Sequence, residues 1–108
     1  MINLTPHVIR VVNADGSIKE IASSGAVVRI TVRNIPAGQI GGIDIFTQET
    51  GHVIGLPEAT EGETFIVSLA VRQAVPGRSD VFSPGELVRD DKGQPIGCRG
   101  LVANGGGQ

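Results

Sequence analysis

The chain has 108 residues, a formal net charge of −2, and hydrophobic residues at 40% of its positions. This length is close to the commonest size of a single domain, and the composition excludes a disordered chain. With no Trp, no Tyr and three Phe, the core must be aliphatic, and the aromatic platforms of single-strand binders are missing. A slightly acidic chain also lacks the basic surface that nucleic-acid binding requires, so we expect no nucleic-acid partner.

The cysteine and histidine content excludes several other classes. A single cysteine, Cys98, excludes an internal disulfide and a cysteine-based zinc site, and the two His leave little for any metal. We therefore expect no metal and no cofactor. The start of the chain lacks the pattern of a signal peptide, and no apolar stretch approaches the roughly 18–20 residues that span a bilayer. We expect no membrane partner and a cytoplasmic location.

Short β-branched runs separated by turn residues fill the first half of the chain. The segment 27–34 alternates most regularly between apolar and polar side chains, as a half-buried strand does. The segment 35–42 carries three glycines and is predicted to be a flexible loop, and a further turn is predicted at 49–51. The strands expected in this half lie at 8–12, 18–22, 27–34, 43–47 and 52–54.

The second half adds one short helix. Residues 64–67 read as a buried strand, and the Ser68 hydroxyl is suited to cap a helix over 69–75. A loop at 76–85 leads to a closing hairpin, with strands at 87–89 and 96–102. These elements predict a mainly β fold with one short helix, as a small antiparallel barrel or sandwich. One domain is expected at residues 1–103, and a flexible glycine-rich tail at 104–108.

Polar residues gather at Asn3, Thr5 and His7, before the first regular strand. Their side chains offer donors and acceptors that could read the polar edge of a ligand. The alternative is structural, because Asn and Thr beside a proline also cap turns without any ligand.

Arginines provide the candidate anion contacts. Arg78 and Asp80 form either an anion-binding loop, in which Asp80 orients the Arg78 fork, or an ion pair that only organises the loop. Arg99 follows Cys98, but strand alternation points the two side chains to opposite faces. Cys98 itself is interpreted as an inert core residue, because a catalytic thiol needs an activating base.

Three segments together resemble a family of small proteins encoded by bacteriophages and by prophage genes in bacteria. They are NLTPH at 3–7, FIVS at 65–68 with the later Arg78 and Asp80, and LVRDDKGQPIGCRGL at 87–101. The resemblance covers roughly residues 2–102. It implies phage origin, and hence the host cytoplasm, but it carries no mechanism with it. Small phage proteins of this scale include homo-oligomers that trap nucleotide immune signals in pockets containing arginine.

Three functions follow as hypotheses. In the first, a homo-oligomer binds a phosphorylated nucleotide-type ligand and sequesters a host immune signal. Its ligand-binding residues would be Asn3, Thr5, His7, Ser68, Arg78, Asp80 and Arg99. In the second, a phosphodiesterase-like enzyme cleaves such a signal with His7 as the acid or base, although no enzyme signature is present. In the third, the chain is a structural or assembly component of a phage particle. Many short strands with edges to protect predict self-association in any case.

Overall fold

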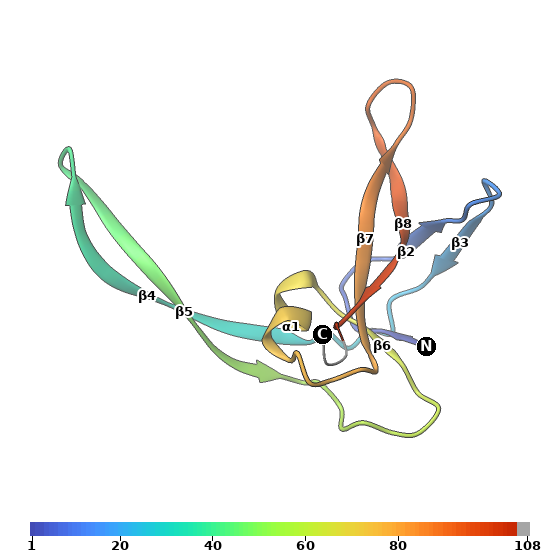
Figure 1. Cartoon of the computed structure of the whole chain (residues 1–108), viewed down its shortest axis with the longest axis horizontal. Coiled ribbons are helices and arrows are strands. Elements are labelled where there is room, and N and C mark those ends of the chain that lie inside the picture. The colour runs from blue at the N-terminus through green and yellow to red at the C-terminus, as the bar shows by residue number, and fades with distance from the viewer. Residues whose placement is uncertain (106–108) are drawn as a thin grey trace.

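The computed structural model describes residues 1–105 as eight strands and one helix (Figure 1). In chain order the elements are β1 (Ile2–Asn3), β2 (Ile9–Val12), β3 (Ile18–Ile21), β4 (Arg29–Ile40), β5 (Ile43–Ile54), β6 (Phe65–Ile66), α1 (Leu69–Ala74), β7 (Val81–Arg89) and β8 (Pro95–Ala103). The expectation of a mainly β chain with one short helix is confirmed. Within residues 1–105, no helix is long and apolar enough to cross a membrane.

Six of the strands form one sheet, in the order β1-β6-β7-β8-β2-β3. The pairs β2–β3 and β7–β8 are antiparallel hairpins, whereas β1–β6, β6–β7 and β2–β8 are parallel. The sheet is thus mixed rather than purely antiparallel. Turn residues in a sequence reveal hairpins, but they do not reveal which strands from distant parts of the chain pair. Since β1 and β3 stand at its two edges, this sheet does not close into a barrel.

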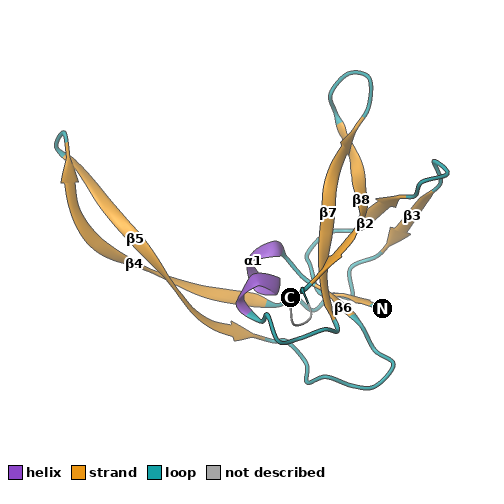
Figure 2. Ribbon diagram, viewed as in Figure 1, coloured by secondary structure: helices purple, strands orange, loops and turns teal. Residues whose placement is uncertain are grey.

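The core lies on both sides of β6. Phe65 and Val67 pack in one cluster with Val71 of the helix, while Ile66 packs in a second cluster with Cys98. This division follows from the alternation of side chains along a strand. The helix α1 contacts β7 and the base of the β4–β5 hairpin, and so joins the two sheets (Figure 2).

The strands β4 and β5 form a separate hairpin that projects from the core, which we call the arm (residues 29–54). At its base, Ile30 and Val53 pack against the core cluster of Phe65. The radius of gyration is 16.8 Å, whereas a compact chain of about 100 residues has roughly 13 Å. The arm and the β7–β8 hairpin leave the core in different directions and account for this extended outline (Figure 1).

The prediction of a flexible loop at 35–42 was wrong, because β4 continues to Ile40. Gly41 and Gly42 have φ of 59° and 81° and form the tight turn at the end of the arm. Positive φ at two successive residues gives the hairpin turn that best matches strand twist, and glycine adopts it without a steric penalty. The glycines that indicated a loop therefore build a turn of two residues.

The turn predicted at 49–51 was also wrong, because β5 runs through it to Ile54. A side chain at Gly51 would collide with the Thr31 hydroxyl on β4, at a shift in strand register. That hydroxyl accepts a hydrogen bond from the backbone N–H of His52 at 2.8 Å. Gly51 is therefore required for the close approach of two strands rather than for a turn.

The other expected elements are present, with small changes in their ends. The hairpin of β2 and β3, the short helix and the closing hairpin of β7 and β8 are confirmed. The loop predicted at 76–85 is shorter, because β7 already begins at Val81, which is fully buried. Asn104 is the first residue of the predicted tail, and its Nδ2 donates to the carbonyls of Val75 and Arg78 at 2.8 and 2.9 Å. Residues 106–108 of the predicted tail lie outside the described residues.

Candidate functional site

The side chain of Asn3 is committed to the fold. The residue is 1% exposed, and its Nδ2 donates to the carbonyl oxygens of His7 at 2.8 Å and Ile21 at 3.0 Å. Its Oδ1 accepts from the backbone N–H of Thr5 at 3.0 Å and from the Thr5 hydroxyl at 2.6 Å. Both donors of the amide are in use, as are two acceptor positions. Asn3 and Thr5 therefore hold the chain in place between β1 and β2. This is a structural role, the alternative to ligand binding that the sequence offers for these residues.

Ser68 is used in the same way. Its Oγ accepts from the backbone N–H of Val71 at 3.3 Å, and it is the N-cap of α1. The cap predicted from the sequence is therefore confirmed, and the hydroxyl satisfies one of the free amides at the start of the helix.

Arg78 and Asp80 form a forked ion pair. Nε and Nη2 of Arg78 each donate to a different oxygen of Asp80 at 2.9 Å, and Nη2 also donates to the carbonyl of Pro57 at 2.9 Å. Hydrogen bonding to Arg78 lowers the pKa of Asp80, and the same contact raises the pKa of Arg78. The pair ties the loop before β7 to the segment after β5, which is the organising role considered in the sequence.

The predicted residues do not form one site. Parallel pairing sets Phe65 beside Val81, so Asp80 lies beside Thr64 at the amino end of β6. Ser68 lies past the carboxyl end of that strand, and four residues of extended chain separate the two ends by about 13 Å.

Two predicted ligand residues keep exposed side chains, His7 before β2 and Arg99 on β8. Neither side chain makes a hydrogen bond within the described part of the chain. Cys98 pairs with Val11 in parallel, so Arg99 lies beside Val12. His7 lies in the bend before β2, five positions before Val12 in the chain.

A partly buried network that the sequence analysis missed joins the helix to β7 and to the segment after β8. Ser83 is fully buried and accepts from Nε of Arg72 at 2.7 Å. Nη1 of Arg72 also donates to the side chain of Asn104 at 3.3 Å. Nothing in the sequence around Arg72 indicates that its hydrogen-bond partner lies on a strand farther along the chain. Together with its hydrogen bonds to Val75 and Arg78, this contact holds Asn104 against the helix and the loop that follows it.

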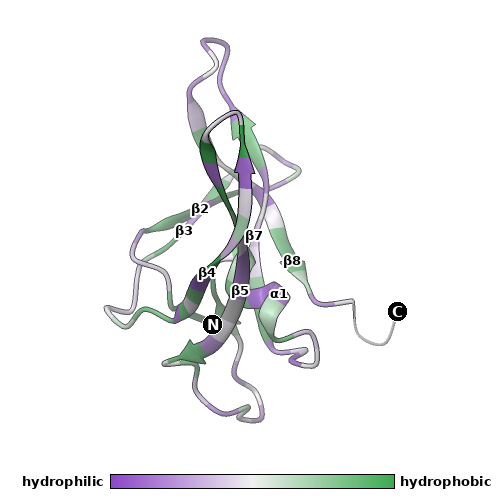
Figure 3. Ribbon diagram, turned by 90° about the vertical axis from the view of Figure 1, so that its left-hand side faces the viewer, coloured by the Kyte–Doolittle hydropathy of each residue, from purple (hydrophilic) through white to green (hydrophobic). Residues whose placement is uncertain are grey.

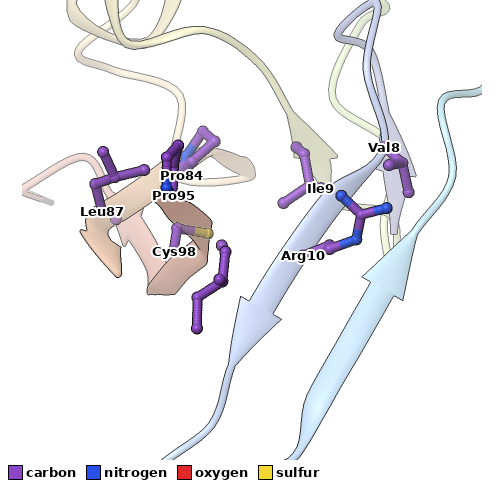
Figure 4. Close-up of a pocket in the computed structure, with 10 residues that line it drawn as sticks. Val8, Ile9, Arg10, Pro84, Leu87, Pro95 and Cys98 are labelled. Carbon is purple, nitrogen blue, oxygen red and sulfur yellow. The ribbon is translucent and has the colours of Figure 1, made fainter. Parts of the chain in front are cut away.

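A groove of about 290 Å³ lies between the start of β2 and the β7–β8 hairpin (Figure 4). Its lining includes the exposed apolar residues Leu87, Val8 and Ile96, which are 52%, 40% and 36% exposed. Arg10 is the one charged residue among the described residues that line it. Cys98 lies in its wall and is buried, as expected for a core cysteine. The groove was missed because its residues come from separate strands that each look ordinary in sequence.

The distal part of the arm, residues 35–46, carries exposed apolar side chains on both of its faces, because side chains alternate along β5. Ile40, Ile43 and Phe46 are 70%, 67% and 51% exposed. Asp44 is its single ionisable residue. Figure 3 views the molecule from the side of the arm and shows apolar residues on both arm strands. Three exposed apolar side chains near the end of one projecting hairpin make it a candidate for contact with other molecules.

Comparison with known proteins adds no assignment. No protein-family model matches the chain, and neither a curated protein nor a solved structure matches it. Among residues 1–105, no three His, Cys, Asp or Glu side chains lie close enough together to hold a metal ion. The groove and the arm are therefore the features of the described residues from which we infer a function.

Proposed function

We propose that this chain is an assembly subunit, which joins copies of itself through the distal part of the arm. The observation that carries the proposal is the exposure of Ile40, Ile43 and Phe46 on a hairpin that projects from the core. Large apolar side chains are more stable in a protein interior than in water. Full burial of each one at an interface would stabilise a complex by about 2 kcal/mol.

The construction of the arm supports the same function. A two-stranded hairpin is marginally stable in water when it stands alone, and the strands β4 and β5 are each 12 residues long. Both strands also present unpaired backbone groups along their outer edges, which invite pairing or covering by another chain. Contact with a second subunit would stabilise the hairpin and shield its apolar side chains at once.

Binding of a small anionic nucleotide-type ligand stays a prediction. Asn3, Thr5, Ser68, Arg78 and Asp80 are used within the fold, so Arg99 and His7 are the residues left to carry it. The enzyme hypothesis likewise stays a prediction that depends on His7 alone. Phage origin and a cytoplasmic location are expectations from the sequence, and an assembly subunit agrees with a component of a phage particle.

Sedimentation velocity tests the proposal. The wild-type chain should sediment as a dimer or a larger species at tens of micromolar, on the order of weak protein interfaces. The double variant Ile43→Ser with Phe46→Ser should weaken association by about a thousandfold, from about 2 kcal/mol for each side chain. The control Ile18→Ser changes a residue on β3 that is 51% exposed, as Phe46 is. It should associate like the wild type. A wild-type chain that stays monomeric throughout would contradict the proposal.

A further inference from the structure

We infer that the groove between β2 and the β7–β8 hairpin receives the distal arm of a second copy. The inference rests on the proposed function, and it names the surface on which the arm packs. Each molecule would then give one arm and receive one.

The two surfaces have matching chemistry. Leu87, Val8 and Ile96 line the groove and are partly exposed, while the arm presents Ile40 and Ile43 at its turn. Apolar side chains on both sides would leave water together when they meet. The volume of about 290 Å³ lies at the lower limit of small-molecule pockets, and its open, apolar lining suits a peptide segment.

Charge complementarity orients the contact. Arg10 uses Nε to bind Glu20 at 3.0 Å, and its two terminal nitrogens make no hydrogen bond to a described residue. In the distal arm, Oδ1 of Asp44 accepts from Gln39 at 2.7 Å, and Oδ2 makes no hydrogen bond to a described residue. Among the described residues, the charged side chain that lines the groove is therefore the arginine of the Arg10–Glu20 pair, and the ionisable side chain of the distal arm is an aspartate. A guanidinium and a carboxylate with unused atoms can form a charge-assisted pair. Because Ile43 and Asp44 are successive residues of β5, their side chains point to opposite faces, so both reach the groove only when the end of the arm enters it between its walls.

The occupant must come from another molecule. The arm and the β7–β8 hairpin leave the core in different directions, so the turn of the arm lies away from the strands β2, β7 and β8 that line the groove (Figure 1). Because the arm and the groove are different surfaces of the chain, the contact is either exchanged between two molecules or repeated head to tail, in a ring or along a filament.

Cysteine crosslinking between two variants tests the contact. One chain carries Ile43→Cys on the arm, and the other carries Leu87→Cys in the groove together with a mass tag. Both chains also carry Cys98→Ala, so that each has one thiol. A short bismaleimide should join them into a tagged mixed dimer. In the matched control, Ile18→Cys replaces Leu87→Cys and presents a thiol of similar exposure outside the groove. The control should give no mixed dimer.

Sedimentation of the same chains separates the two proposals. The chains could associate while Ile43→Cys fails to crosslink with Leu87→Cys, or crosslinks equally well with Ile18→Cys. The groove is then not the receiving surface, and this inference fails while the proposed function stands. If the chains are monomeric, the proposed function fails as well. Crosslinking that is specific to Leu87→Cys, and is lost when Asp44→Arg is added to the arm chain, supports the inference.

Discussion

The substitution Asn3→Asp tests whether the polar start of the chain is structural. The Asn3 amide donates to two carbonyl oxygens, those of His7 and Ile21, and the residue is 1% exposed. A carboxylate of the same shape has no donor, so it would lose both hydrogen bonds to these carbonyls and bury a negative charge beside them. An unsatisfied buried group costs about 1–3 kcal/mol, and more when it is charged. We expect a loss of about 3–4 kcal/mol, which lowers Tm by roughly 12–30 °C.

Urea unfolding at several pH values measures this loss. Burial should raise the pKa of the introduced carboxyl, so the folded state would bind a proton more readily than the unfolded state. The penalty should therefore be largest at neutral pH and should shrink as the pH falls and the carboxyl becomes neutral. Asn3→Ala removes the donors without a charge and should cost about 2 kcal/mol at every pH.

The same change at an exposed turn provides the control. Asn13 is exposed, and its side chain binds only Ser17 at 3.1 Å among the described residues. Asn13→Asp should therefore alter stability by less than about 0.5 kcal/mol. If Asn3→Asp is tolerated as well as Asn13→Asp, the hydrogen bonds of Asn3 do not hold the fold and the structural account of this segment is refuted.

Three further predictions concern the other candidate site residues. Asp80→Asn should cost about 1–2 kcal/mol at neutral pH. Because the folded pKa of Asp80 is lowered, its stabilisation is present above its unfolded pKa of about 3.9 and is lost as the pH falls through the folded value. Acid unfolding curves of variant and wild type should therefore converge at low pH, and parallel curves would refute this. Ser68→Ala should cost about 1 kcal/mol in urea unfolding, and no change would mean the cap is not formed in solution. If an anionic nucleotide binds, a thermal-shift screen should give a hit that Arg99→Ala removes and Arg78→Ala does not, whereas no hit in the panel would count against the ligand.

The sequence predicts the local elements of this fold well and their long-range arrangement poorly. The hairpin of β2 and β3 and the Ser68 cap depend on neighbouring residues, so their signals are local. The parallel pairing of β1 with β6 joins Ile2 to Phe65, and no turn or periodicity marks it. The arm was missed because Gly41, Gly42 and Gly51 indicate breaks in sequence, yet two form a tight turn and one allows close strand packing.

The sequence suggested polar ligand sites that the fold uses internally, and it did not reveal the two apolar surfaces. Polar residue types at Asn3, Thr5 and Arg78 suggested a ligand, but the same donors and acceptors serve the backbone when the chain folds around them. The distal arm and the groove were not recognised, because their apolar residues have the composition of ordinary buried strands. Only the structure shows that Phe46 and Leu87 are exposed.

A single introduced fluorophore measures most directly whether the arm packs against another subunit in solution. The chain has no Trp and no Tyr, so Phe46→Trp places one indole at a position that is 51% exposed in the isolated chain. The account predicts that its emission moves to shorter wavelength as concentration rises, over the range in which the mass from light scattering rises above 11.2 kDa. An emission typical of water at every concentration, with the mass of one chain throughout, would contradict the account.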